Sequence, residues 1–159
     1  MRKEILKQSE PGRLPSFELI DVATLAQVMV TSEDADHPVE MAFDGRGGPG
    51  GTRWVAAADG EQTLIVAFDD PQRVHGILLE IEEPEVARTQ QLQVAISTDG
   101  GGSYREIVRQ EYNFSPPGTS FERERWSAEA EGVTHLRLVI APDKGVRPGR
   151  ASVTTLALY

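Results

Sequence analysis

The sequence contains no cysteine, and no stretch of it stays apolar over the length of a membrane span. The first absence excludes disulfide bonds, thiolate nucleophiles and cysteine-based zinc or iron–sulfur sites. The second excludes a transmembrane helix, which needs about 20 mostly apolar residues in a row. Charged residues interrupt the segment from Met1 to Lys7, so no signal-like apolar stretch is expected there. These absences predict a cytoplasmic protein without a membrane partner.

Basic side chains are scarce relative to acidic ones. The 159 residues include 16 Lys and Arg against 25 Asp and Glu, which gives a formal net charge of −9 at pH 7. A chain of this charge repels a phosphate backbone. Nucleic acid is therefore not an expected partner.

Long helical periodicity is also missing, and from about Leu25 onward apolar residues tend to alternate with polar ones. In residues 91–97, for example, Leu92, Val94 and Ile96 would face a core while glutamine and serine face water. Turn residues separate eight segments of this kind, which predicts antiparallel strands. The predicted strands are 26–31, 63–68, 73–81, 91–97, 104–114, 120–126, 133–140 and 152–159.

The expected fold is an all-β, antiparallel sandwich of about eight strands with one short helix. The length suits a single domain. The segment Asp36–Phe43 has an acidic capping residue followed by Pro38, a pattern typical of a helix start, and predicts one or two helical turns. Residues 1–24 are expected to form an N-terminal arm, packed on or flexibly attached to a sandwich domain of residues 25–159.

The motifs of common catalytic sites are absent. The sequence has no Gly-x-Ser-x-Gly nucleophile elbow, no phosphate-binding glycine loop and no histidines at metal-ligand spacing. Acidic pairs such as Glu80 and Glu82 have the residue types of a glycosidase pair, but two residues apart on one strand they share a face toward solvent. We therefore expect no enzymatic activity.

Several motifs occur in an order that points to a known family. Residues 37–45 (HPVEMAFDG) are followed by Thr52-Arg53-Trp54, and residues 97–104 form a Ser-x-Asp-Gly turn that leads to a tyrosine. The strand pair around residues 68–77 and the last strand, ending at Leu158-Tyr159, complete the pattern. Over about residues 25–159 the chain resembles the discoidin domain, the coagulation factor type C family of galactose-binding-like sandwiches.

This resemblance implies a jelly-roll β-sandwich that is usually non-catalytic and binds its ligand with the loops at one end. Members of the family bind sugars, anionic lipids or proteins. We therefore predict a binding module that holds a carbohydrate or another small polar ligand. The alternative is a protein-interaction or scaffold domain that binds no sugar and forms a homodimer.

The resemblance also implies a structural calcium ion near Asp44 and Thr52. Carboxylate, hydroxyl and backbone carbonyl oxygens are the ligands that Ca²⁺ prefers. In the family an acidic residue of the last strand commonly completes the site, whereas this chain has Thr155 at the matching place. The alternative is that Asp44 belongs to a turn and Thr52 is an ordinary loop hydroxyl. No other cofactor is expected.

Three residues are candidate ligand contacts because of their places in the family pattern. Trp54 has a flat face for stacking on a sugar ring, and the alternative is packing in the core. Glu83 and Arg88 fall where sugar-binding relatives place charged residues, and both present two polar groups in one plane for vicinal hydroxyls. The alternative for this pair is a solvated charged turn.

Two further segments supply candidate contacts. Lys144 and Arg147, with Arg150 nearby, form a basic loop on an acidic protein, which suits an acidic ligand or partner. Tyr112 and Phe114 precede a proline-rich connection that is unusually apolar for a loop and is typical of a recognition surface. The alternatives are an ordinary solvated turn for the basic loop and closure of the core for the two aromatics.

Overall fold

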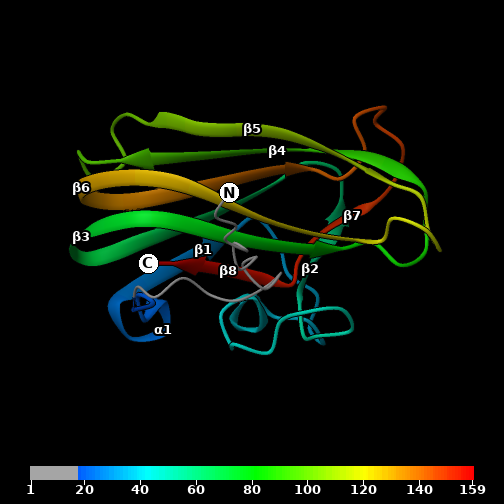
Figure 1. Cartoon of the computed structure of the whole chain (residues 1–159), viewed down its shortest axis with the longest axis horizontal. Helices are drawn as coiled ribbons and strands as arrows, with labels where there is room; N and C mark the ends of the chain where they lie inside the picture. The colour runs from blue at the N-terminus through cyan, green and yellow to red at the C-terminus, as the bar shows by residue number, and fades with distance from the viewer. Residues whose placement is uncertain (1–17) are drawn as a thin grey trace, which may run out of the picture.

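The computed structural model describes residues 18–159, which form eight strands and two short helices (Figure 1). No described helix has the length and apolar character needed to cross a membrane. The elements in chain order are α1 (Val22–Leu25), β1 (Ala26–Val30), the 3-10 helix η1 (Val39–Ala42), β2 (Trp54–Asp59), β3 (Gln62–Glu82), β4 (Arg88–Ser97), β5 (Arg105–Phe114), β6 (Phe121–Ala141), β7 (Arg150–Val153) and β8 (Thr155–Leu158).

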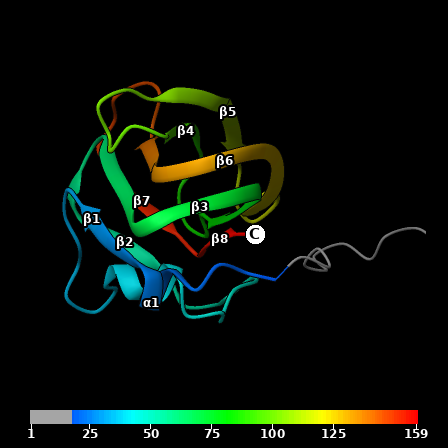
Figure 2. The same ribbon diagram turned by 90° about the vertical axis from the view of Figure 1, so that its left-hand side faces the viewer.

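Two long strands, β3 and β6, hold the fold together. The main sheet has the order β1-β3-β6-β4-β5 with β8 added to β3, and β2 pairs separately with β7. All these pairs are antiparallel. The first part of β3 pairs with β1 and the last part of β6, whereas its last part pairs with the first part of β6 and with β8. The sheet therefore folds back on itself, and its strands wind around a common interior (Figure 2).

The bends of β3 and β6 correct part of the predicted strand pattern. Segments 63–68 and 73–81 belong to one strand, because the predicted turn at Asp69–Pro71 is an irregular bend within β3. The pairing with β6 shifts register between Ala67 and Gln72 at this bend. A bulge tolerates proline, which cannot donate to a β-ladder. In the same way, segments 120–126 and 133–140 are both parts of β6.

The C-terminal strand and β2 also differ from the prediction. The segment 152–159 is divided into β7 and β8 at Thr154, whose backbone N–H donates to the carbonyl of Glu80 at 2.9 Å. Strand β2 was not predicted, because its sequence, Trp-Val-Ala-Ala-Ala-Asp, lacks a strong alternation and is rich in alanine.

The apolar side of residues 91–97 is confirmed, since Leu92, Val94 and Ile96 are all buried, but Ser97, which was expected to face water, is buried too and donates its hydroxyl to Asp99 at 2.6 Å. The three apolar residues belong to a continuous core between the two parts of the folded sheet. The largest fully buried side chains of this core include Trp54, Leu64, Ile77, Leu79, Ile81, Leu92, Leu136, Leu138, Ile140, Leu156 and Leu158.

Both short helices lie beside the sandwich. Helix η1 falls within the segment 36–43 that predicts a short helix. Helix α1 lies in the last part of the predicted N-terminal arm and is capped by Asp21, whose carboxylate accepts from the Thr24 backbone N–H at 3.3 Å. Val22 is buried in the core. Residues 1–17 of that predicted arm lie outside the described residues.

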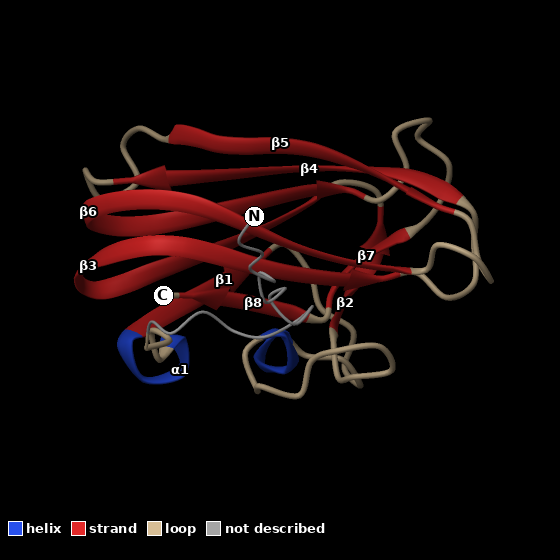
Figure 3. Cartoon of the chain, viewed as in Figure 1, coloured by secondary structure: helices blue, strands red, loops and turns tan. Residues whose placement is uncertain are grey.

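Several connecting loops lie together because the strand ends that they join are paired with one another. Glu82 at the end of β3 pairs with Phe121 at the start of β6, and Arg88 at the start of β4 pairs with Phe114 at the end of β5. The loops 83–87, 115–120 and 142–149 therefore lie at one end of the sandwich, on the right in Figures 1 and 3. We call this the loop end.

Candidate functional site

Two neighbouring hollows lie at the loop end, with volumes of about 330 and 260 Å³. Arg53, Glu82 and Pro84 line both, so these three residues form the boundary between them. The larger hollow continues to Arg150 on β7, and the smaller to His37. We call the two hollows together the end groove.

Arg53 and Glu82 supply the donors and acceptors at the centre of the end groove. Arg53 directly precedes Trp54 at the start of β2, and since successive strand residues face opposite sides, the buried Trp54 leaves Arg53 on the outside. The Arg53 side chain makes no hydrogen bond or ion pair with any described residue. One carboxylate oxygen of Glu82, Oε2, accepts from the Gly50 backbone N–H at 2.8 Å. The groove thus presents an uncommitted guanidinium beside a carboxylate.

Asp34 organises the walls on either side of this centre. Its Oδ1 accepts from the Asp36 backbone N–H at 2.9 Å and lies 3.4 Å from Nδ1 of His37, while Arg150 Nη1 donates to its Oδ2 at 3.3 Å. The hydrogen bond from Asp36, followed by that from His37, holds the pKa of Asp34 below its usual range. Asp34 is therefore ionised at neutral pH and keeps both side chains at the groove.

Glu83 and Arg88, two predicted ligand contacts, lie at the larger hollow but bind each other. Their side chains form an ion pair, and each is only 9% exposed. Glu83 Oε1 also accepts from the Val86 backbone N–H at 2.9 Å, and Arg88 Nη2 donates to the carbonyl of Arg150 at 3.3 Å. The pair is a buried support of the groove wall. This burial agrees neither with the predicted contact to a ligand nor with the alternative prediction of a solvated charged turn.

The predicted aromatic contacts are part of the core, which corrects the expectation of an exposed recognition surface. Trp54 is fully buried, and its Nε1 donates to the carbonyl of Ser32 at 3.1 Å. Tyr112 and Phe114 are 4% and 2% exposed, and their rings pack edge to face with centroids 6.1 Å apart. Burial, followed by the charges of Glu124 and Glu122, raises the pKa of Tyr112. The burial of Trp54, Tyr112 and Phe114 agrees with the alternative prediction that these side chains pack in the core.

Lys144 and Arg147 lie at the loop end but outside the end groove. Lys144 Nζ donates to Glu111 Oε1 at 2.6 Å, and Arg147 Nε donates to the buried Asp143 at 2.8 Å. Arg147 Nη2 also donates to the carbonyl of Ala87 at 3.3 Å, which links the loops 142–149 and 83–87. The predicted basic loop is therefore largely neutralised by its own acidic neighbours.

Asp44 and Thr52 lie together but bind each other directly. Thr52 Oγ1 donates to Asp44 Oδ2 at 2.6 Å, and the Arg46 backbone N–H donates to Oδ1 at 2.9 Å. A calcium ion takes six to eight oxygen ligands. Across residues 18–159 no group of three or more His, Cys, Asp or Glu side chains is placed to hold a metal ion. The arrangement closes a loop by hydrogen bonds among Asp44, Arg46 and Thr52.

Because the Asp44 carboxylate already accepts two hydrogen bonds, these contacts lead to a prediction for the purified protein. Adding millimolar Ca²⁺, or removing divalent ions with EDTA, is expected to leave the melting temperature unchanged, because only a ligand that binds the folded state raises it. Differential scanning fluorimetry in a chelator-treated buffer measures the effect, with Mg²⁺ as the ionic-strength control. A rise with Ca²⁺ that EDTA reverses would show that a calcium site exists.

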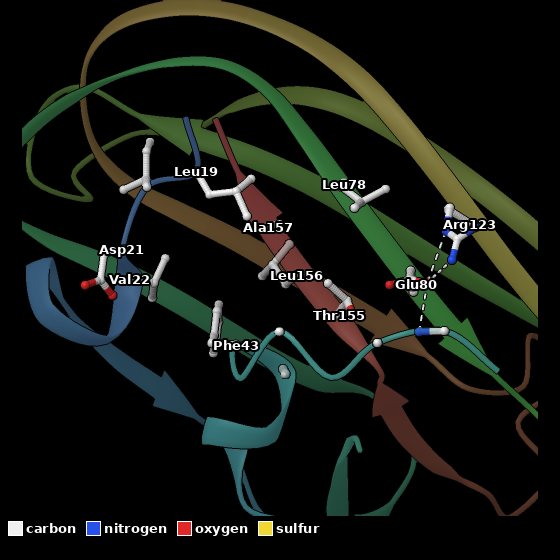
Figure 4. Close-up of a pocket in the computed structure, with 15 residues that line it drawn as sticks. Leu19, Asp21, Val22, Phe43, Leu78, Glu80, Arg123, Thr155, Leu156 and Ala157 are labelled. Atoms are coloured by element: carbon white, nitrogen blue, oxygen red, sulfur yellow. Dashed lines mark hydrogen bonds and ion pairs between the residues drawn. The ribbon is translucent and has the colours of Figure 1, made fainter. Parts of the chain in front are cut away.

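A larger cavity of about 460 Å³ lies along the side of the sandwich, between β8 and the segment that contains α1 (Figure 4). Leu78, Leu156 and Phe43 are among its apolar lining residues. At its polar end, Arg123 Nη2 and Nε donate to Oε2 of the buried Glu80 at 2.7 and 3.1 Å, as the dashed lines of Figure 4 show. The Gly48 backbone N–H donates to the same oxygen at 3.2 Å. These groups satisfy one another and attach the 44–51 loop to the sheet.

Arg53 is a site residue that was not predicted from the sequence, although it belongs to the Thr52-Arg53-Trp54 motif. The available signal was the position itself, because a residue next to a buried strand tryptophan points outward. The approach of Glu82 and Arg150 to Arg53 depends on β3 and β7, which the sequence does not place side by side.

Comparison with known proteins identifies the fold. No protein-family model matches the chain, and no curated protein matches it in sequence. Among solved structures, the family 32 carbohydrate-binding module of Clostridium perfringens NanJ, in complex with galactose, has a TM-score of 0.62 at 14% identity. This match covers 88% of this chain and 96% of that one.

Two other modules of that family are similarly close. A module of Clostridium perfringens GH89, in complex with GalNAc-β-1,3-galactose, has a TM-score of 0.61 at 17% identity over 89% of this chain and 99% of that one. The module of AlyQ, in complex with 4,5-unsaturated mannuronic acid, has a TM-score of 0.63 at 17% identity over 90% and 98%. The predicted fold class is confirmed: this chain has the discoidin, or galactose-binding-like, β-sandwich fold.

Proposed function

We propose that this chain is a non-catalytic carbohydrate-binding module that holds a sugar in the end groove. The observation that carries the proposal is that the guanidinium of Arg53, which has no partner among the described residues, and the Glu82 carboxylate line the same two hollows. A sugar hydroxyl both donates and accepts hydrogen bonds. Planar guanidinium and carboxylate groups each engage two neighbouring hydroxyls, and charge-assisted bonds of this kind are the stronger ones.

The fold supports a sugar ligand as well. Several solved structures that share it are carbohydrate-binding modules in complex with galactose, GalNAc-β-1,3-galactose or 4,5-unsaturated mannuronic acid. The end groove lies at the loop end, where the resemblance to the discoidin family places the ligand. The protein-interaction alternative relied on exposed aromatics around Tyr112 and Phe114, and since both rings are buried, no observation favours it.

Arg53→Ala is expected to weaken sugar binding by about tenfold to a hundredfold. A hydrogen bond to a charged group contributes about 1.5–3 kcal/mol, and about 1.4 kcal/mol corresponds to a factor of ten in affinity. The measurement is isothermal titration with a panel of galactose, N-acetylgalactosamine, GlcNAc-α-1,4-galactose and unsaturated mannuronic acid. Arg109→Ala is the matched control, because Arg109 is an exposed arginine of β5 that pairs with Glu106 and lies outside the end groove.

Two results would contradict the proposal. One is that no sugar of the panel binds or raises the melting temperature of the unmodified protein. The other is that Arg53→Ala and Arg109→Ala bind a sugar equally well. Glu82→Gln, which keeps the shape of the side chain and removes its charge, tests the acceptor in the same way.

A further inference from the structure

The end groove does not stop at its two hollows. A third hollow, of about 480 Å³, shares Asp59 and Pro148 with the larger hollow of the end groove. A fourth, of about 510 Å³, shares Asp143, Lys144 and Arg147 with the third. The four hollows therefore lie next to one another at the loop end, each sharing lining residues with the next, from the 83–87 loop to the 142–149 loop. We call this series the extended groove.

The lining of the extended groove lacks a stacking platform. Among the described residues that line it there is no Phe, Tyr or Trp. A sugar unit in any one hollow must therefore be held mainly by hydrogen bonds, and each of these has a modest net value in water. Pockets for compact ligands are typically about 300–1,000 Å³, so each hollow has room for only a small unit. Useful affinity then requires contacts in several hollows at once.

The charge of the lining limits the kind of ligand. Carboxylates outnumber basic side chains along the extended groove. Most of the basic groups are already paired: Arg88 with Glu83, Arg150 with Asp34, Lys144 with Glu111 and Arg147 with Asp143. An anionic ligand would meet this excess of negative charge, whereas hydroxyl groups find both donors and acceptors.

We propose that the extended groove binds several consecutive units of an uncharged glycan chain, and that it does not select a single terminal sugar. This inference rests on the proposed function. It adds that the ligand is a neutral oligosaccharide or polysaccharide, and that Lys144, far from Arg53 along the series of hollows, contacts the units of a long ligand that a short ligand does not reach.

The test is the dependence of affinity on chain length. Dissociation constants are measured by isothermal titration for galactose and for β-1,4-linked galactose oligomers of two, four and six units. The same series is measured with galacturonic acid and its oligomers, which carry one carboxylate per unit. The hexamer of galactose is expected to bind at least about tenfold more tightly than the monomer, because it adds several hydrogen bonds. Lys144→Ala is expected to weaken hexamer binding more than dimer binding, and Arg109→Ala to change neither.

Each outcome decides a different part of the inference. Affinity that does not increase with length, with measurable binding of galactose, would overturn the extended ligand and leave the proposed function intact. Tighter binding of the galacturonic acid oligomers would overturn the uncharged ligand. An equal effect of Lys144→Ala on dimer and hexamer would overturn the role of Lys144. No binding of any sugar in either series, or in the panel above, would overturn the proposed function itself.

Discussion

Replacement of Trp54 by alanine is expected to lower the free energy of unfolding by about 3–5 kcal/mol, the usual cost of truncating a large buried aromatic side chain. The Trp54 ring is fully buried in the core, so its removal exposes apolar surface and leaves a cavity among well-packed neighbours. The indole N–H is also lost as a donor to the Ser32 carbonyl, 3.1 Å away. Urea denaturation followed by circular dichroism measures the change.

Two further variants separate the causes of this loss. Trp54→Phe keeps an aromatic ring and removes the hydrogen bond, so it is expected to cost less than Trp54→Ala. Trp126→Ala is the matched control, because the second tryptophan of the chain is only partly buried against the same core. Its truncation is expected to cost less than that of Trp54. If Trp54 instead contacted sugar, Trp54→Ala would abolish binding and leave the unfolding curve in place.

The strands of the main sheet differ in how well the sequence predicts them. The alternation of residues 91–97 predicts strand β4 correctly, because Leu92, Val94 and Ile96 are buried while Gln91 and Gln93 on the other face are partly exposed. At the bend of β3 the sequence instead predicts a turn, since Asp69, Asp70 and Pro71 are typical turn residues. Only the pairing of β3 with β6 on both sides of the bend shows that the strand continues. Local residue types therefore identify the strands better than they identify the ends of the strands.

The candidate site is less predictable than the fold, because its charged residues are sorted by long-range contacts. The sequence places Glu83, Arg88, Lys144 and Arg147 in loops, and all four do lie at the loop end. Whether each is free or engaged depends on partners such as Asp143 and the carbonyl of Arg150. Arg53, which has no such partner among the described residues, does not differ from the others in sequence alone.

Replacement of Arg88 by methionine is the second change expected to have a large effect, a loss of about 3–5 kcal/mol of unfolding free energy. Removing one member of a buried ion pair leaves the other charge uncompensated, and this cost commonly exceeds the net value of the pair itself. Both side chains are 9% exposed, so water screens the Glu83 carboxylate poorly. Gly149 packs closely on the guanidinium, since a Cβ at Gly149 would clash with Arg88 Nη1.

A double-mutant cycle tests this explanation. Glu83→Gln with Arg88→Met is expected to be less destabilising than Arg88→Met alone, because the double variant contains no unpaired buried charge. The exposed pair Arg109–Glu106 provides the matched control, and its disruption is expected to cost about 1 kcal/mol or less. Urea denaturation of the four proteins gives the coupling energy. If Arg88→Met costs no more than Arg109→Met, the Glu83–Arg88 pair does not support the fold.

The same pair connects stability to binding. Glu83 holds the 83–87 loop through the Val86 N–H, and Arg88 holds the start of β7 through the Arg150 carbonyl. Both segments form walls of the larger hollow of the end groove. Arg88→Met is therefore expected to weaken sugar binding through the groove wall, because the Arg88 guanidinium is engaged by Glu83 and the Arg150 carbonyl. In contrast to Arg53→Ala, which should weaken binding at unchanged stability, it should lower affinity and unfolding free energy together. Titration and denaturation of the same two variants distinguish the residue that contacts the ligand from the residue that holds the wall.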